Sequence, residues 1–224
     1  MTELASARPT EVYITVKDLL DLPRAMVEDI VRLGGTPILV DNASTYPPTV
    51  EWLNSTTHRV VRMEKNKGIR AAWTIPGLTE RYVVTDCDLD LSTVPSDVFQ
   101  VMHEELNRAD TYTKVGLSLE INDIPDHNPD KPFILSNEGK YWNTKEGRGY
   151  NAPIDTTFAM YRRSGWGGYS AIRLDRPYTA RHVPWYWDPK HLPEDYKHYL
   201  RNPDLSGISY SDRTSKARPT LQGP

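Results

Sequence analysis

The hydrophobic pattern of the first half of the chain alternates between short β-branched runs and longer segments of helical period. The run EVYITV at 11–16 predicts a strand. In the segment that follows, apolar residues recur at helical spacing and share one face: Leu22, Met26, Ile30 and Leu33. Asp21 is placed to cap this helix, Pro23 suits its first turn, and Gly34-Gly35 ends it.

The same alternation continues to about residue 110. Further strands are expected at 36–42, 58–63 and 81–86. Helices are expected near 49–55, at 66–75 and at 95–109, the last capped by Ser96 or Asp97. Strands separated by helices in this rhythm predict βαβ units, and therefore an α/β fold with a mainly parallel sheet flanked by helices. In such sheets, ligands bind outside the carboxyl ends of the strands.

The second half of the chain is less regular. The runs at 114–121 and 156–163 predict strands. Between them, residues 122–153 are rich in Pro, Asn, Asp and Gly, and we expect an irregular loop there that acts as a lid or contacts an acceptor.

Composition restricts the possible settings. The 224 residues fit one domain, and a net charge of −3 gives no reason to expect strong binding to a polyanion. Cys87 is the only cysteine, so an internal disulfide is excluded and a reducing compartment is the simplest inference. Because the sequence shows neither a secretory signal nor an apolar run of membrane-spanning length, we expect a cytoplasmic protein without an integral membrane segment.

The strongest chemical signal is the segment YVVTDCDLDLS, in which Asp86, Asp88 and Asp90 follow an apolar run within five positions. Asp86 and Asp88 point to the same side of extended backbone. Two carboxylates at a strand end suit a hard cation such as Mn²⁺ or Mg²⁺, which would remove their repulsion and bridge them to phosphate oxygens. The alternative is a solvated acidic turn in which Asp90 caps the residues that follow.

This Asp-x-Asp, together with Asp41 after the second strand in LVDNAST, resembles the GT-A fold glycosyltransferases, particularly the family 2-like group. The resemblance implies a GT-A, Rossmann-like sheet with a loop-rich acceptor side. It also implies that Asp41 contacts the nucleobase or ribose of a nucleotide-sugar, that Asp86 contacts the ribose, and that Asp88 holds a metal on the diphosphate.

The segment EKNKGIRAAW is similar to the Asn-x-Gly segment of the same family. This similarity implies that Asn66 lies near the nucleotide and that Arg70 or Lys65 faces the phosphates. The resemblance implies a nucleotide-sugar-binding half at 1–110 and an acceptor-side half of the same domain at 111–206. Residues 207–224 are polar and contain proline, and we expect a flexible tail there.

The segment GYNAPIDTTFAMYRRSGW resembles the strand on which GT-A enzymes carry acceptor-side residues. An inverting transferase needs a carboxylate to remove the acceptor proton, and Asp155 is the first candidate. Asp155 could equally be a turn or cap residue beside Thr156 and Thr157, and Glu120 and Asp123 are the reserve candidates. A retaining mechanism would require no such base.

The segment ARHVPWYWDP contains His182 among aromatic residues. GT-A enzymes often use a late histidine as a metal ligand, and the resemblance extends this role to His182; the alternative is a histidine that is simply packed. Trp185, Tyr186 and Trp187 could stack on a sugar or belong to the core. Arg181 is a candidate for binding hydroxyls or phosphate.

The sequence therefore favours a metal-dependent glycosyltransferase. It would move a sugar from a nucleoside-diphosphate donor, with UDP-sugars favoured, to a hydroxyl acceptor with inversion. The acceptor class stays open among a saccharide, a protein, a small metabolite, a lipid-linked glycan and a modified nucleobase in DNA, and the lack of a membrane segment slightly disfavours the lipid-linked glycan. Two alternatives are a haloacid-dehalogenase-type phosphatase and a non-catalytic metal- or carbohydrate-binding protein. A sugar nucleotidyltransferase is disfavoured because VYITVKDLLDLP contains no glycine for a phosphate loop.

Overall fold

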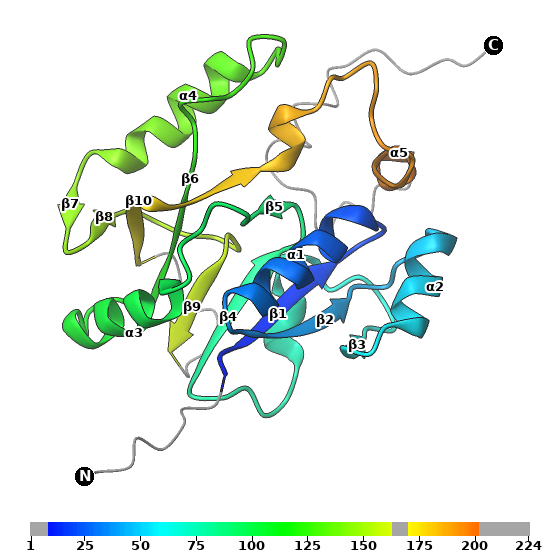
Figure 1. The fold of residues 1–224 in the computed structure, drawn as a ribbon, viewed down its shortest axis with the longest axis horizontal. Helices are drawn as coiled ribbons and strands as arrows, with labels where there is room; N and C mark the ends of the chain where they lie inside the picture. The colour runs from blue at the N-terminus through cyan, green and yellow to red at the C-terminus, as the bar shows by residue number, and fades with distance from the viewer. Residues whose placement is uncertain (1–8, 163–169, 202–224) are drawn as a thin grey trace.

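The computed structural model describes residues 9–162 and 170–201, and its centre is a ten-stranded sheet. In chain order the strands are β1 (Glu11–Val16), β2 (Thr36–Asp41), β3 (Arg59–Arg62), β4 (Arg81–Asp86), β5 (Leu89–Asp90), β6 (Lys114–Leu119), β7 (Lys145–Glu146), β8 (Gly149–Asn151), β9 (Ala159–Arg162) and β10 (Ala171–His182). Across the sheet their order is β3-β2-β1-β4-β9-β6-β10-β8-β7, and β5 pairs with β10 (Figure 1).

The sheet is parallel through its first half and mixed beyond it. β1 pairs in parallel with β2 and β4, β2 pairs in parallel with β3, and β6 pairs in parallel with β10. β9 runs antiparallel between β4 and β6, and the β7–β8 hairpin adds antiparallel strands at the far edge. The α/β fold class with a mainly parallel sheet is therefore confirmed.

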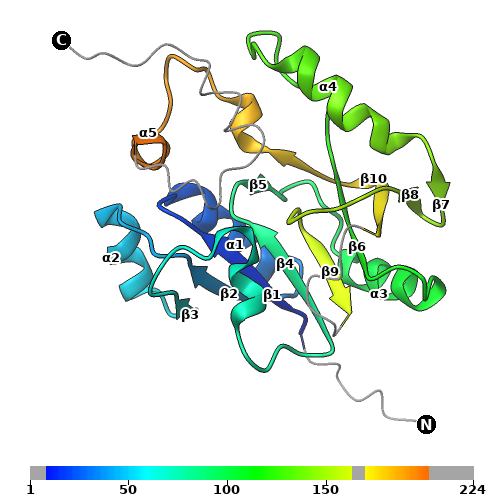
Figure 2. The ribbon, with the colours of Figure 1, turned by 180° about the vertical axis from the view of Figure 1, so that it is seen from behind.

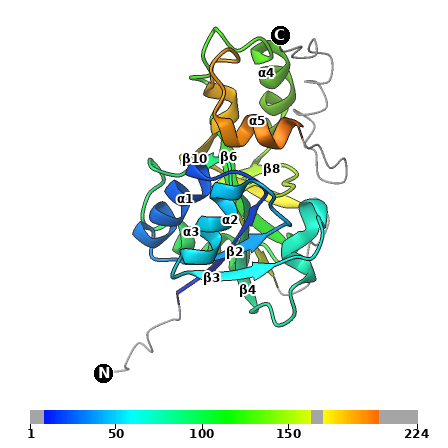
Figure 3. The ribbon, with the colours of Figure 1, turned by 90° about the vertical axis from the view of Figure 1, so that its right-hand side faces the viewer.

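Helices flank the sheet on both sides. They are α1 (Asp21–Arg32), α2 (Pro47–Ser55), α3 (Val98–Arg108), α4 (Lys131–Gly139) and α5 (Glu194–Arg201), with 3₁₀ turns η1 (Gly68–Thr74), η2 (Lys140–Trp142) and η3 (Val183–Tyr186). α1 and α3 pack on one face and η1 on the other, as the two opposite views show (Figures 1 and 2). α4 and α5 lie above β2, β3 and β4 in the side view (Figure 3). Within the described part of the chain, every helix is too short or too polar to span a bilayer.

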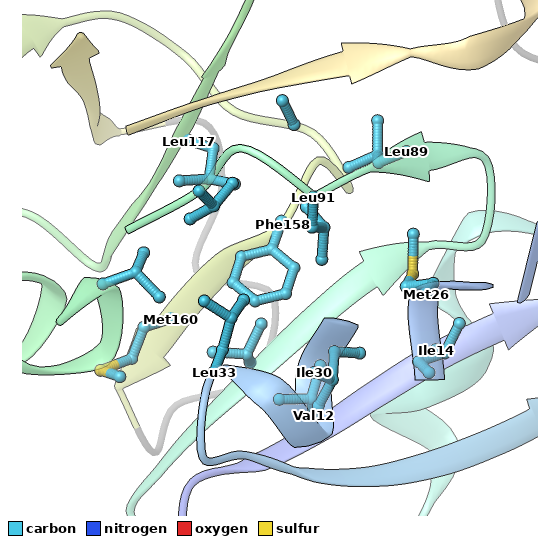
Figure 4. Packing of buried hydrophobic residues seen from close by; sticks show 14 of the residues in the cluster. Val12, Ile14, Met26, Ile30, Leu33, Leu89, Leu91, Leu117, Phe158 and Met160 are labelled. Carbon is cyan, nitrogen blue, oxygen red and sulfur yellow. The ribbon is translucent and has the colours of Figure 1, made fainter. Parts of the chain in front are cut away.

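The core lies on both faces of β1. Val12 and Ile14 point into the cluster formed with Met26 and Ile30 of α1 (Figure 4). Tyr13, between them, points into the opposite cluster with the small residues of η1. Burial on both faces explains why this strand reads as a nearly continuous apolar run rather than as an alternation.

The first half matches the sequence closely, with corrections at the helix caps and at 66–75, which forms a 3₁₀ turn. The cap predicted at Asp21 is wrong: Leu20 holds the N-cap position, and its N–H donates to the Asp195 carboxylate at 2.8 Å. Asp97 does hold the N-cap position of α3, but its carboxylate accepts the Tyr178 hydroxyl instead of a helix N–H.

The second half departs further from expectation. Residues 122–153 are not an irregular loop, because they contain α4, η2 and the β7–β8 hairpin. β10 and α5 were not predicted. The sequence of β10, AIRLDRPYTARH, mixes charged residues with a proline, and its register against β6 shifts between Leu174 and Thr179. The predicted tail at 207–224 and the end of the strand predicted at 156–163 lie outside the described residues.

Gly116 of β6 offers a direct test of packing between β6 and β9. A Cβ at Gly116 would lie 2.6 Å from Cβ of Ala159 and 2.7 Å from the Phe158 carbonyl oxygen. Because the carbonyl oxygen belongs to the backbone, Gly116→Ala should lower the free energy of unfolding by about 1–3 kcal/mol in urea titrations.

The matched control is Gly139→Ala, where an added Cβ meets no atom within 4 Å. That change should leave the free energy of unfolding unchanged or raise it slightly, because alanine favours helix. Equal stability of the Gly116→Ala variant and the wild type would contradict the close approach of β9 to β6.

Candidate functional site

Several carboxylates meet at the carboxyl ends of the parallel strands. The register of β1 places Val16 opposite Asp41 of β2 and Thr15 opposite Asp86 of β4. The ends of these strands therefore lie side by side. β5, directly after β4, pairs with the end of β10 so that Leu89 lies opposite His182. This pairing brings the late histidine to the acidic edge.

Asp88 and His182 are in direct contact. Nε2 of His182 lies 3.1 Å from Oδ2 of Asp88, and the Val183 N–H donates to the Asp88 carbonyl at 2.9 Å. Oδ1 of Asp88 is buried without a hydrogen-bond partner among the described residues. The His182 ring also packs on Trp185, with 4.8 Å between the ring centroids. His182 therefore contacts a carboxylate and is also packed against an aromatic ring, as each of the two interpretations of this residue expected.

The electrostatics of the cluster separate its two aspartates. Burial raises the pKa of Asp86 well above its usual range, and repulsion from Asp88 and Asp155 adds to this effect. Burial also opposes ionisation of Asp88, but the charge and hydrogen bond of His182 outweigh it and lower the pKa of Asp88. The cluster therefore keeps its negative charge on Asp88 and disfavours a second charge on Asp86.

The turn before β9 joins this cluster. The Thr156 hydroxyl donates to Oδ2 of Asp86 at 2.6 Å, and the Asp86 N–H donates to the Thr156 carbonyl at 3.1 Å. Asp155 is exposed, and its Oδ1 accepts the Thr156 N–H at 2.8 Å and the Thr157 hydroxyl at 3.3 Å. Asp155 thus makes the hydrogen bonds expected of a turn residue, and its side chain is exposed to solvent beside the cluster.

Asp41, predicted to contact the nucleoside, is held within the protein. Its side chain is nearly buried, its Oδ1 accepts the Ser44 N–H at 2.9 Å, and its Oδ2 pairs with Arg62 at 2.7 Å. Arg62 in turn donates to Asn54. A nucleoside contact at Asp41 would share a carboxylate that already has two partners.

Asn66 closes the loop after β3 onto the end of β2. Its side-chain oxygen accepts the Asn42 amide and the Gly68 N–H, each at 2.7 Å, and Asn42 accepts the Lys67 N–H at 2.7 Å. Arg70 lies exposed on η1, which follows this loop. The structure thus places Asn66 close to the end of β2, with its oxygen committed to the loop.

The two reserve carboxylates are both paired with arginine. Arg181 contacts Oδ2 of Asp123 through Nε at 2.7 Å and Nη2 at 2.6 Å, and the Tyr186 hydroxyl donates to the other oxygen. Arg176 contacts Glu120 through Nε at 2.9 Å and Nη2 at 2.7 Å. Carboxylates held in this way are poor bases: against the effect of burial, Arg176 lowers the pKa of Glu120, and Tyr186 together with Arg181 lowers the pKa of Asp123.

The aromatic segment of η3 lies partly in the core. Trp185 packs against the main hydrophobic cluster, and its carbonyl accepts the Asn128 amide at 2.7 Å. The Trp185 indole nitrogen is buried without a hydrogen-bond partner among the described residues. Trp187 packs on Tyr196 of α5 at 4.7 Å between ring centroids. The three aromatics therefore do not form one continuous wall.

Sequence reasoning missed Asp18, although the pair Lys17-Asp18 stands at the end of the first strand. Asp18 is fully buried with a left-handed φ of 63°, and its Oδ1 accepts the N–H groups of Thr45 and Tyr46. Burial raises the pKa of Asp18, but these donors and Lys17 outweigh burial and lower it. Thr45 also contacts His198 of α5 at 2.9 Å, so α5 reaches this edge.

In residues 9–162 and 170–201, no group of three or more His, Cys, Asp or Glu side chains is arranged to hold a metal ion. Cys87, between Asp86 and Asp88, is buried. Burial and the neighbouring carboxylates raise the pKa of its thiol well above the ordinary value, so Cys87 is a poor nucleophile and a poor metal ligand. The groups of metal-ligand type that are in direct contact at this edge are the Asp88 carboxylate and the His182 imidazole.

Comparisons with known proteins give a distant structural likeness. No protein-family model matches the chain, and no curated protein matches it. Among solved structures, it is similar to glucosyl-3-phosphoglycerate synthase from Mycobacterium tuberculosis, crystallised in complex with phosphoglyceric acid. The identity is 14% and the TM-score 0.44, over 70% of this chain and 57% of that one. The chain thus spans less than two thirds of that protein.

Asp18→Asn tests the electrostatic contribution of the edge to stability. The amide keeps an acceptor for Thr45 and Tyr46 but loses the charge beside Lys17, so the free energy of unfolding at neutral pH should fall by about 1–3 kcal/mol. Because the folded pKa of Asp18 is lowered, the wild-type advantage is complete above the reference pKa of 3.8 and disappears as pH falls through the folded value.

Denaturant titrations of wild type and variant between neutral and acid pH measure this difference. Asp126→Asn is the control, since its side chain is 99% exposed and its ion pair with Lys131 should matter little. A wild-type advantage that stays constant down to the lowest pH would contradict the assignment to Asp18.

Proposed function

We propose that this chain is a glycosyltransferase. It moves a sugar from a nucleoside-diphosphate donor, with UDP-sugars favoured, to a hydroxyl acceptor with inversion, and it uses Mn²⁺ or Mg²⁺. The observation that carries the proposal is the 3.1 Å contact of Asp88 with His182 at the carboxyl edge of the sheet. Asp86, the proposed ribose contact, lies beside the proposed metal ligands. All three residues are at the carboxyl ends of the strands, where ligands bind in such folds.

Asp88 and His182 fit a divalent ion. Asp88 offers a buried Oδ1 without a hydrogen-bond partner among the described residues, and its Oδ2 faces the imidazole. One carboxylate and one imidazole suit Mn²⁺, and an ion with few protein ligands takes the rest from water and substrate phosphates. When bound, the ion would stabilise the charge that develops on the diphosphate.

In this proposal residues 1–110 bind the donor. Asp86 contacts the ribose through the oxygen that Thr156 leaves free, and Asp41 receives the nucleobase or ribose beside Arg62. Asn66 holds the loop that closes this side of the site, and Arg70, exposed on η1, faces the phosphates.

Asp155 is the proposed base. It is the exposed carboxylate on the turn that contacts Asp86, whereas Glu120 and Asp123 are occupied by arginines. As the acceptor oxygen attacks the anomeric carbon, its proton passes to Asp155 and the bond from that carbon to the diphosphate breaks. The sugar is thus transferred to the acceptor with inversion at the anomeric carbon.

Residues 111–206 form the proposed acceptor side, with Trp185 and Arg181 as contacts. Asp123 neutralises Arg181, so an acceptor here need not be an anion. We propose a neutral hydroxyl group, carried by a saccharide, a protein or a modified nucleobase.

A phosphatase assay beside the transferase assay distinguishes this function from phosphate-ester hydrolysis.

Asp88→Asn tests the metal role. Removal of the charge should weaken Mn²⁺-dependent UDP binding in calorimetry by about 30-fold or more and abolish transfer, because a neutral amide is a poor ligand for a hard cation. The fold should stay intact by circular dichroism. The matched control is Asp90→Asn: Asp90 belongs to the same acidic run, but its Oδ1 accepts the Ser92 N–H at 2.8 Å.

The control variant should bind UDP like the wild type. Full transfer activity in the Asp88→Asn variant, or equal losses in both variants, would refute the assignment of Asp88.

Asp155→Asn tests the base. UDP release from a panel of UDP-sugars should fall about 10²- to 10⁴-fold, the usual effect of losing a general base, with little change in UDP affinity. Glu120→Gln is the control, since Glu120 is held by Arg176, and its rate should stay close to that of the wild type. An unaffected rate in Asp155→Asn would remove this residue from the mechanism and favour a retaining reaction.

A further inference from the structure

One short turn holds both halves of the site together. Thr156 is buried, and it makes two reciprocal hydrogen bonds with the end of β4: its hydroxyl donates to Asp86 Oδ2 at 2.6 Å, and its carbonyl accepts the Asp86 N–H at 3.1 Å. These bonds join residues 70 positions apart in the sequence. Thr156 therefore controls both the backbone and the side chain of Asp86.

The hydroxyl fixes one oxygen of the Asp86 side chain and leaves the other available. Thr156 holds Oδ2 of Asp86, and Oδ1 accepts no hydrogen bond from the described residues. An acceptor oxygen with a fixed direction and no internal partner is ready to receive a hydroxyl donor.

We propose that Thr156 is a positioning residue for the donor nucleotide, which fixes the Asp86 carboxylate so that Oδ1 faces the ribose hydroxyls. The inference rests on the proposed function and adds a specific residue to it. Thr156 does not touch the reacting atoms and acts through Asp86.

The same turn carries the proposed base. The Thr156 N–H donates to Asp155 Oδ1 at 2.8 Å, so one residue contacts the nucleoside-side carboxylate and the acceptor-side carboxylate together. Arg173 holds the start of this turn, because it donates to the Pro153 carbonyl at 2.9 Å. Arg173 is itself fixed by an ion pair with Glu138 of α4 at 2.8 Å. Thr156 thus fixes the distance between donor and acceptor sides.

The experiment measures UDP affinity in the presence of Mn²⁺ by calorimetry. Thr156→Val keeps the side-chain shape and removes the hydroxyl, and it should weaken UDP binding about 10- to 100-fold, the range for leaving a buried acceptor without its hydrogen-bond partner. Thr156→Ser restores the hydroxyl and should bind within about threefold of the wild type. Thr156→Ala replaces the valine variant if that variant does not fold.

Ser118→Ala controls for the general cost of losing a buried hydroxyl. Ser118 donates to the Leu174 carbonyl at 2.6 Å, between β6 and β10. This variant should lose thermal stability comparable to that lost by Thr156→Val while keeping wild-type UDP affinity. A purely structural role for Thr156 would make the two variants behave alike.

A double-mutant cycle with Asp86→Asn shows whether Thr156 acts through Asp86. If it does, Thr156→Val adds little to the loss already caused by Asp86→Asn. Wild-type UDP affinity in Thr156→Val, or fully additive losses in the cycle, would overturn the inference and leave the proposed function standing. A wild type that binds none of UDP, GDP, ADP and CDP with Mn²⁺ would overturn the proposed function, and this inference with it.

Discussion

The pairing of β5 with the end of β10 determines the character of the acidic edge. It places Leu89 opposite His182 and the Val183 N–H on the Asp88 carbonyl, and so brings the imidazole against the Asp88 carboxylate. Without this pairing, the aspartates after β4 would be an acidic turn in solvent. With it, they become a partly buried cluster in which one carboxylate contacts an imidazole, the environment in which functional groups acquire shifted pKa values.

The surrounding contacts hold this edge from both ends of the chain. Thr156 joins the turn before β9 to Asp86, and Asp195 of α5 accepts the Leu20 N–H at the start of α1. His198 of the same helix contacts Thr45, whose N–H donates to Asp18. A sheet with both faces buried supplies a rigid base, so that small displacements of these side chains are resisted by packing.

Sequence patterns predicted the part of the fold that depends on local periodicity. The strands from β1 to β4 and the helix α1 follow from apolar spacing, and the position of Asp88 at the edge of the sheet follows from its place after a buried strand. Other features depend on contacts between distant segments. The N-cap residue of α1, Leu20, donates its N–H to Asp195, from the far end of the described chain. β10 was missed because its charged residues form ion pairs such as Arg173 with Glu138, which no local pattern reveals.

Pulsed electron paramagnetic resonance of Mn²⁺ bound to the protein with UDP examines the Asp88–His182 site without an acceptor or a known donor sugar. A metal on this pair has a directly bound nitrogen, so the spectrum should show nitrogen modulation that is lost in His182→Gln. A protein-bound Mn²⁺–UDP complex without nitrogen modulation, or with modulation unchanged in that variant, would contradict the metal site and the function built on it.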